Sequence, residues 1–311
     1  VYHSQHPLAI RASIERMLDT SLKRHDPEMI WRQPEIRKAL LEHSEGNHLF
    51  IVLATPVAEI GRDHDYDWAI AEPSSMRSII QLAGRVQRHR YQVRDEANLI
   101  ILSSNYNGLV GKEIAFTKPG FESLDFPLRS HNLNELLQKE QYQVVSSIPR
   151  IMVRDPIKPN DNLADLEHEH IRAKMFGSEQ PEIRQYAALW WKRDAHWSYE
   201  LQRRSRFRSS APDIEYVLYV DEDEDTPEFH LVNDRGELVR CEKEFVHTSP
   251  VMAHGNSPWG DNNLSAILYD LSEAMDMDMA YASRRFATLR LREADRRWHY
   301  NHALGVYQPL D

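Results

Sequence analysis

The first part of this 311-residue sequence predicts an α/β fold in which helices flank a parallel sheet. The second part predicts a mostly helical domain with a small β-hairpin. The runs LFIVLA (49–54) and NLIIL (98–102) are continuously apolar, as is typical of strands that are buried on both faces of a parallel sheet. Stretches with apolar residues at helical spacing alternate with these runs, and such alternation indicates crossover connections.

The chain opens with the end of a strand at residues 1–2, and a helix follows it. Pro7 suits the first helical turn, where the missing N–H group of proline costs no hydrogen bond. A further strand is predicted at WAI (68–70), between the two longer apolar runs. Five residues of the first helix recur at helical spacing: Ile10, Ile14, Met17, Leu18 and Leu22.

The stretch 75–90 contains four arginines, and a helix is predicted over about residues 75–89. Gln81, Arg85 and Arg88 share one face of this helix at positions i, i+4 and i+7. Gly84 leaves space there for a second surface. Two guanidinium groups one turn apart suit the oxygen atoms of a phosphate, and their charge does not titrate. Three other residues are expected to pack on the sheet: Ile79, Ala83 and Val86.

The loop at residues 55–66 (TPVAEIGRDHDY) follows the second predicted strand, at the edge where such sheets bind ligands. Thr55 stands at the C-terminal end of that strand, where a hydroxyl group can contact a phosphate. Gly61, Arg62 and Asp63 suit a tight turn that faces a ligand. Each feature alone is also typical of an ordinary loop and of a helix with solvated arginines. The ordered set of features favours a ligand site.

Residues 126–160 contain several prolines and predict a linker. Helices are predicted after it at 162–175 and 181–206, followed by strands around a turn at NDRG (233–236) and a helix near 262–276. A last helix at 279–298 carries six arginines on several faces: Arg284, Arg285, Arg290, Arg292, Arg296 and Arg297.

Residues 188–208 mix tryptophans with arginines. This composition suits a helical core with an exposed basic end, and it also suits stacking against single-stranded DNA. Acidic residues outnumber basic ones by 48 to 38 over the whole chain, which argues mildly against nucleic-acid binding. The basic residues are clustered, however, so the composition leaves DNA binding open.

Cys241 is the only cysteine, which excludes a disulfide scaffold and predicts a cytoplasmic protein. No apolar run approaches the length of a membrane span, so we expect no membrane association. The sequence does not begin with methionine, and we therefore expect a fragment or a processed product.

The order YHS (2–4), ATPVAEIGRDHDYDWAI (54–70) and QLAGRVQRHR (81–90) resembles motifs IV, V and VI of superfamily 2 helicases. The last stretch matches the form Q-x-x-G-R-x-x-R in full. The continuous stretch DHDYDWAIAEPSSMRSIIQLAGRVQRHR (63–90) is similar to the CRISPR-associated helicase-nuclease of type I systems, subtype I-F. This resemblance implies a second RecA-like lobe at 1–125, a linker at 126–160 and a C-terminal accessory domain at 161–311.

The resemblance also implies roles for individual residues. Arg85 and Arg88 would stabilise the charge of the γ-phosphate of ATP, and Gln81 would couple the nucleotide to the interface between lobes. Gly61 and Asp63 would belong to the nucleotide site. Four residues would bind the backbone of single-stranded DNA: Ser4, Thr55, His3 and Arg62. Pro56 replaces a glutamine found in many relatives, so the polar contact assumed at that position is in doubt.

The implied protein is an ATP-driven translocase that degrades invader DNA. Its Mg²⁺ ligands would lie on the first RecA-like lobe, and its nuclease metal ions would lie in an upstream nuclease domain. The implied partners are single-stranded DNA, the RNA-guided surveillance complex, the first lobe with the nuclease domain, the CRISPR adaptation integrase and phage anti-CRISPR proteins. We expect this chain to be inactive by itself, since it lacks the phosphate-binding loop and the acidic pair that such motors need.

Two stretches imitate parts of a nucleotide site. GLVGKE (108–113) resembles a phosphate-binding loop, but only two residues separate its glycines, and Glu113 stands where a hydroxyl residue belongs. VLYVDEDE (217–224) imitates a strand with a Mg²⁺-binding acidic pair, but it follows motif VI, whereas such pairs precede it. A solvated acidic hairpin loop is the favoured interpretation of this second stretch.

Two further stretches imitate metal sites. In LEHEH (166–170), His168 and His170 are two residues apart and point to different sides of a helix. In DHD (63–65), no other histidines at matching spacing complete a nuclease site. We therefore predict no metal ligand in this chain.

Two other functions remain possible at this point. The chain can belong to another superfamily 2 helicase, from DNA repair or RNA metabolism. It can also be a docking module that uses the fold without nucleotide chemistry. The intact set of Gln81, Gly84, Arg85 and Arg88 argues against a docking module, because such a module needs neither arginine.

Overall fold

The computed structural model describes residues 1–44, 46–59, 61–90, 95–117, 119–177, 187, 213–220, 226–260 and 262–309. The protein is mixed α/β, and it forms two compact units, each with a hydrophobic core. Unit 1 consists of Val1–Ala58 and Ala211–Asp311, and unit 2 consists of Glu59–Ser210. These units do not coincide with the domains 1–125, 126–160 and 161–311, whose boundaries stay a prediction. No helix in the described ranges is long and apolar enough to cross a membrane.

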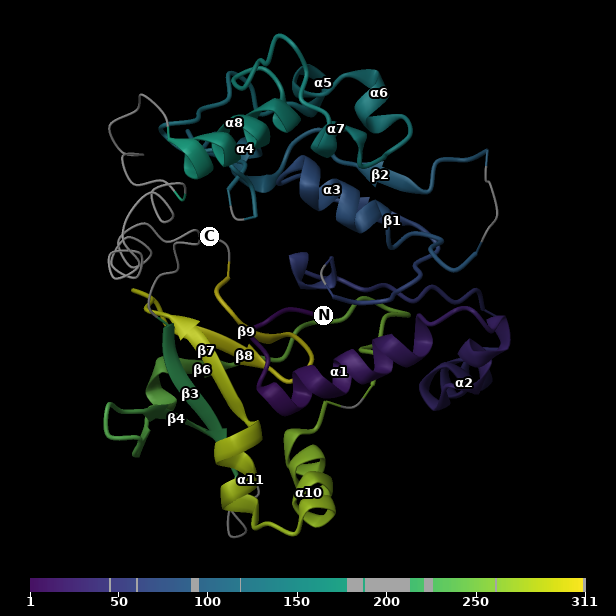
Figure 1. The fold of residues 1–311 in the computed structure, drawn as a ribbon. Coiled ribbons are helices and arrows are strands. Elements are labelled where there is room, and N and C mark those ends of the chain that lie inside the picture. The colour runs from purple at the N-terminus through teal and green to yellow at the C-terminus, as the bar shows by residue number, and fades with distance from the viewer. Residues whose placement is uncertain are drawn as a thin grey trace. The chain divides into compact units, whose positions relative to one another are not determined.

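Unit 1 contains two small sheets whose strands are mostly antiparallel (Figure 1). The first has the strand order β5-β4-β3-β7 and is antiparallel throughout; the second has the order β6-β8-β9, with β6 parallel to β8. Helices α10 and α11 lie side by side at one end of the first sheet in Figure 1. The strands are β3 (Asp213–Tyr219), β4 (Glu228–Val232), β5 (Leu238–Arg240), β6 (Phe245–His247), β7 (Thr288–Arg292), β8 (Trp298–Asn301) and β9 (Gly305–Tyr307).

The helices of unit 1 precede and interrupt these strands. They are α1 (Leu8–Ser21), η1 (Pro27–Arg32), α2 (Pro34–Glu42), η2 (Pro56–Ala58), η5 (Glu242–Glu244), α10 (Leu264–Met275) and α11 (Met279–Phe286). Helix α1 confirms the first predicted helix, although Pro7 stands at its N-cap, one position before its first turn. Ile10, Ile14 and Leu18 are buried in the core of unit 1, as their spacing predicts.

The helix predicted over 279–298 is wrong in its second half. Helix α11 ends at Phe286, and strand β7 begins at Thr288. In β7, Leu289 and Leu291 are buried, whereas Arg290 and Arg292 are exposed, because successive side chains of a strand point to opposite faces. This alternation is present in the sequence TLRLR. In its described residues the C-terminal region therefore combines helices with two mostly antiparallel sheets, where we expected a mostly helical domain with one small hairpin.

The predicted hairpin around NDRG is confirmed. Strands β4 and β5 pair in antiparallel fashion, the N–H of Asn233 donates to the carbonyl of Glu237, and Gly236 adopts a positive φ of 77° in the turn. The acidic run 221–225 lies outside the described residues, as do the stretch 188–208 and most of the predicted helix 181–206.

The run LFIVLA does not form a strand buried on both faces. Its residues form neither a strand nor a helix, and a parallel bridge joins Ala54 to Tyr2. Leu49, Ile51 and Leu53 are each about two-thirds exposed. Burial on both faces requires strand neighbours with helices above and below, and among the described residues of unit 1 this run pairs through that bridge alone. The described residues therefore do not show a RecA-like sheet of several parallel strands.

A tight contact at the start of the chain involves two histidines. His6 is buried and stacks on His3, with ring centroids 4.6 Å apart. Gly305, at φ +74°, passes close to both rings, since a Cβ atom there would lie 2.9 Å from Cε1 of His3 and 3.0 Å from Cε1 of His6. Burial lowers the pKa of His6 to about 3.

Acid is therefore expected to destabilise unit 1 through His6. The unfolded chain binds a proton at this residue near pH 6.5, whereas the folded chain binds it only near pH 3. This contribution to stability is complete above pH 6.5 and is lost as the pH falls toward 3. The thermal unfolding midpoint should fall more steeply over this window in the wild type than in His6→Leu. Equal slopes in the two proteins would contradict the assignment.

Unit 2 contains one parallel strand pair and several short helices (Figure 1). Strands β1 (Ala69–Ala71) and β2 (Leu99–Ile101) pair in parallel, with Ile70 opposite Ile100, which confirms the strands predicted at WAI and NLIIL. The helices are α3 (Met76–Ala83), α4 (Tyr106–Leu109), α5 (Leu133–Leu136), α6 (Lys139–Tyr142), α7 (Ile148–Ile151) and α8 (Leu163–Phe176). Helix α8 confirms the helix predicted at 162–175.

The region predicted as a linker contributes to the core of unit 2. Phe126, Leu133 and Leu136 are buried there, together with Met76 and Ile79 of α3. Their apolar side chains outweigh the prolines, because burying them against α3 and α8 removes a large apolar surface from water. Residues 126–137 therefore contribute to the core of unit 2.

Candidate functional site

Helix α3 has a common capping residue at each end. Ser75 is the N-cap, and its hydroxyl accepts a hydrogen bond from the N–H of Ser78 at 3.1 Å. Gly84 is the C-cap, and its N–H donates to the carbonyl of Ile80. The helix is thus shorter than the predicted 75–89. Gln81 lies within it, whereas Arg85 and Arg88 lie beyond its end and do not share a helical face with Gln81.

Pairing with a second segment explains why the chain leaves the helix. The N–H of Tyr66 donates to the carbonyl of Arg85, and the N–H of Gln87 donates to the carbonyl of Tyr66, both at 2.8 Å. Gln87 adopts a positive φ of 50° in this arrangement. The two bonds form a parallel bridge between Tyr66 and Val86. As a result, residues 63–67 run alongside residues 85–90.

Asp63 and Arg88, both predicted site residues, contact each other directly. Nε of Arg88 donates to Oδ1 of Asp63 at 2.7 Å, and Nη1 of Arg88 donates to the carbonyl of Gly84. Nε2 of His89 lies 3.1 Å from the same oxygen of Asp63. Hydrogen bonding from His89, followed by that from Arg88, lowers the pKa of Asp63 to about 2. Asp63 is therefore a carboxylate at neutral pH that holds Arg88.

A buried ion pair joins the same two segments, and sequence reasoning missed it. The carboxylate of Asp65 is fully buried and accepts two hydrogen bonds from Arg90, from Nε at 3.0 Å and from Nη2 at 2.8 Å. The N–H of His89 also donates to it. Arg90 in addition contacts the exposed Asp67 at 2.5 Å. The signal in the sequence is the alternation of Asp63, Asp65 and Asp67 opposite a basic run.

Arg85 lies close enough to Arg88 and Asp63 for their charges to act on it. Its Nη2 donates to the carbonyl of Glu59 at 3.3 Å. Burial, and next the positive charge of Arg88, lowers the pKa of Arg85. Nε of Arg85 and Oε1 of Gln81 are buried and have no hydrogen-bond partner among the described residues. Such atoms normally bond to a partner. The Nε–H of Arg85 is a donor and therefore fits an anionic group such as a phosphate, whereas the amide oxygen of Gln81 is an acceptor and needs a donor.

Gly61 and Arg62 precede Asp63 in the loop. Gly61 adopts a positive φ of 72°, which favours glycine and agrees with the predicted tight turn. Arg62 is partly exposed beside it. His64 is fully buried, and its Nδ1 lies 3.1 Å from the hydroxyl of Tyr66. His64 thus contributes to packing behind the loop.

Three of the residues predicted to bind DNA, Ser4, Thr55 and His3, belong to unit 1, whereas Arg62 belongs to unit 2. The parallel bridge between Tyr2 and Ala54 brings Ser4 and Thr55 to the same end of two paired segments, and both are exposed. His3 is different. Its Nδ1 accepts from the N–H of Gln5 at 3.0 Å, and its Nε2 lies 2.6 Å from the carbonyl of Leu304. Both ring nitrogens are therefore used by the backbone.

Comparison with known proteins identifies the family. Residues 1–91 match the family model described as CRISPR-associated nuclease/helicase Cas3, C-terminal, and residues 218–308 match the Cas3 subtype I-F/YPEST-like C-terminal domain. A CRISPR-associated nuclease/helicase Cas3 of subtype I-F/YPEST from Pectobacterium atrosepticum is 42% identical over 100% of this chain, and one from Pseudomonas aeruginosa is 42% identical over 98%. The chain belongs to the Cas3 family.

The chain spans 29% of the length of the Pectobacterium relative and 28% of the Pseudomonas relative. The family matches and the identity to these relatives confirm the resemblance to the helicase-nuclease of subtype I-F, which motifs IV, V and VI indicate. Those motifs lie within the first Cas3 match, and the antiparallel sheet of unit 1 lies largely within the second.

The histidines of LEHEH in this Cas3 chain contact separate backbone groups. Nε2 of His168 lies 2.8 Å from the carbonyl of Pro149, and Nδ1 of His170 lies 3.0 Å from the carbonyl of Phe121. They point to different sides of α8, as their spacing predicts. The two histidines therefore attach α7 and the segment at Phe121 to helix α8.

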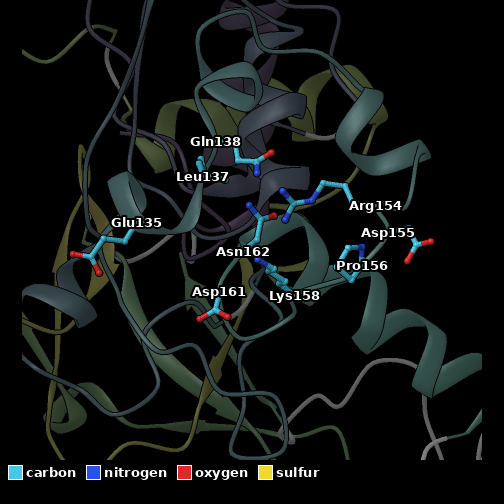
Figure 2. A pocket seen from close by; sticks show the side chains of 9 residues that line it. All are labelled: Glu135, Leu137, Gln138, Arg154, Asp155, Pro156, Lys158, Asp161 and Asn162. Carbon is cyan, nitrogen blue, oxygen red and sulfur yellow. The ribbon is translucent and has the colours of Figure 1, made fainter.

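A pocket of about 430 Å³ lies in unit 2 (Figure 2). In Figure 2 the guanidinium group of Arg154 points toward Asn162, and the carboxylate of Asp155 points away from it. Arg154 is already bonded to Asp165, at 3.0 and 2.5 Å. None of the predicted site residues lines this pocket. Its lining consists of Glu135, Leu137, Gln138, Arg154, Asp155, Pro156, Lys158, Asp161 and Asn162.

Proposed function

We propose that this chain supplies the arginine side of an ATP site and part of a single-stranded DNA path in a Cas3 helicase-nuclease of CRISPR type I-F. The contact between Arg88 and Asp63, with Arg85 beside it, is the observation that carries the proposal. Two arginines held near each other repel, and a bound polyanion relieves that repulsion. Asp63 stabilises Arg88 until such a group arrives.

The residues of motifs V and VI would act together on the nucleotide. Hydrolysis of bound ATP supplies the energy for translocation and develops negative charge on the γ-phosphate. Arg88 would exchange its bond with Asp63 for a bond to phosphate oxygens, because both acceptors are anionic and of similar geometry. Arg85 has an unpartnered Nε among the described residues and would neutralise a second oxygen. Gln81 would report the presence of the nucleotide through its buried amide oxygen.

Single-stranded DNA would contact unit 1 through backbone phosphates. Ser4 and Thr55 are exposed at one end of the paired segments, and a hydroxyl group binds a phosphate oxygen without reading the base. Arg62, in unit 2, would bind a backbone phosphate through its positive charge. His3 would support this path by packing, since its ring nitrogens are bonded to the backbone.

The remaining parts of the machine belong to the proposal as well. The Mg²⁺ ligands would come from a first RecA-like lobe, and DNA cleavage would come from a nuclease domain with its own metal ions. The surveillance complex would recruit the protein to its target. The relatives are more than three times as long as the match, which leaves room for both domains.

The test is ATP hydrolysis by the full-length protein, with and without single-stranded DNA. We expect DNA-stimulated turnover in the wild type, loss of that turnover in the double variant Arg85→Ala/Arg88→Ala, and none in the isolated 311-residue chain. If the double variant kept its turnover, residues 75–90 would be a basic helix and its turn, and the docking-module interpretation would replace this proposal. Hydrolysis by the isolated chain would contradict the claim that the site is shared.

A further inference from the structure

Helix α8 carries a buried carboxylate that the site just described does not use. Glu167 is fully buried at the start of helix α3. Its Oε1 accepts hydrogen bonds from the N–H groups of Met76 at 2.5 Å and of Arg77 at 3.2 Å. These are two of the four N–H groups that a helix leaves without a partner at its first turn. Glu167 thus fixes the beginning of the helix that ends just before the motif VI arginines.

Charged groups from two elements face Glu167. Nη1 of Arg150, on α7, lies 2.7 Å from its Oε2. The positive charge of Arg77, on α3, also attracts the carboxylate of Glu167. Both guanidinium groups lie over the ring of Phe121, that of Arg150 at 5.9 Å and that of Arg77 at 5.4 Å from the ring centroid. Burial, the largest influence, raises the pKa of Glu167 to about 7. Oε1 can accept both N–H bonds whether or not Oε2 carries a proton.

The geometry of α3 transmits this anchor to the arginines. The helix spans eight residues, about 12 Å at 1.5 Å per residue, and it has no glycine or proline inside it to act as a hinge. Its middle is held as well, because the hydroxyl of Ser78 donates to the carboxylate of Glu59 at 2.5 Å. The carbonyl of Glu59 in turn accepts from Arg85. A displacement of the first turn of α3 would therefore displace Arg85 and Arg88.

We propose that Glu167 is a positioning residue, through which α8 sets the place of Arg85 and Arg88 in the ATP site. The inference rests on the proposed function, since it assigns those arginines to a nucleotide. It adds a route by which the region after motif VI controls hydrolysis: a movement of α8 moves the start of α3. Glu167 touches no reacting atom, and it acts through the backbone of Met76 and Arg77.

The test compares three variants in the full-length protein. Glu167→Met removes the acceptor, and we expect kcat for DNA-stimulated ATP hydrolysis to fall by about 10- to 100-fold, as small misplacements of catalytic groups do. Glu167→Gln keeps an acceptor oxygen and is expected to retain kcat within about threefold, since a neutral side chain can still accept both bonds. KM for ATP should change less than kcat, because the arginines act mainly on the transition state.

Leu166→Ala is the control for lost stability. Leu166 is the buried neighbour of Glu167 on α8, and its truncation is expected to lower the unfolding midpoint while the bonds from Glu167 to the N–H groups of α3 remain. If Leu166→Ala lowered kcat as much as Glu167→Met at an equal shift of the unfolding midpoint, the role of Glu167 would be structural only. If Glu167→Met hydrolysed ATP normally while Arg85→Ala/Arg88→Ala did not, this inference alone would fail. Normal ATP hydrolysis by Arg85→Ala/Arg88→Ala would instead overturn the proposed function.

Discussion

Replacing Arg88 alone with alanine is expected to lower the DNA-stimulated ATP turnover of the full-length protein by at least about 10³-fold, as removal of an arginine finger does. The loss corresponds to about 4 kcal/mol of transition-state stabilisation. The reason follows from the proposed function: Arg88 is held by Asp63 at 2.7 Å, and a phosphate of the nucleotide would replace this carboxylate. Steady-state hydrolysis at saturating ATP and DNA measures the effect.

Two further variants sharpen this measurement. Arg88→Lys keeps the charge but loses the planar fork, so its turnover should remain well below that of the wild type. Arg129→Ala removes another arginine of unit 2, which is exposed and paired with Asp161, and it should leave the turnover unchanged. Equal turnover in Arg88→Ala and Arg129→Ala would show that Arg88 is only a surface charge.

Replacing Asp65 with alanine is expected to destabilise unit 2 by about 3–5 kcal/mol, the usual cost of removing one partner of a buried ion pair. The Asp65 carboxylate is fully buried, and it accepts two hydrogen bonds from Arg90 and one from the N–H of His89. Without it, Arg90 would remain partly buried beside an empty space. Urea unfolding measures the total loss. Hydrogen exchange at the amides of Tyr66 and Gln87, which join the two segments, measures the local opening.

The chain offers a matched control for Asp65. Asp67 binds the same arginine at 2.5 Å, but its side chain is 59% exposed. Its replacement by alanine should therefore cost only about 0–1 kcal/mol, as for other exposed ion pairs. If Asp67→Ala destabilised the protein as much as Asp65→Ala, burial would not be the decisive difference between the two ion pairs. The assignment of Asp65–Arg90 as the bond that joins residues 63–67 to residues 85–90 would then be incorrect.

Much of the local structure could be predicted from residues that act on their immediate neighbours. Helices α1 and α8, the strands at WAI and NLIIL, and the NDRG turn follow from spacing, caps and turn residues. The start of α3 at Ser75 also has a local cause, namely its hydroxyl bond to the N–H of Ser78. The same kind of reasoning failed at 279–298, where helical spacing was assumed although TLRLR alternates with the period of a strand.

The residues of the candidate site were also predictable only in part. The family motif identified Asp63, Arg85 and Arg88, and the structure places Asp63 in contact with Arg88. The family motif could not reveal the Asp65–Arg90 ion pair or the contact of Glu167 with α3, because each joins residues about 25 to 90 positions apart in the chain. The tertiary structure also makes His3 a packing residue, since the carbonyl of Leu304 reaches it from the other end of the chain.

The sequence by itself therefore determined the family, the order of its motifs and the residue types that suit phosphate chemistry. Only the tertiary structure decided where α3 ends, which carboxylates are buried and which arginine each of them holds. The physical reason is that caps and hydrophobic periods act over a few residues, whereas burial and ion pairing depend on segments that folding brings together. Arg88 leaves the helix because Tyr66 pairs with the chain after Gly84, and no local rule contains that contact.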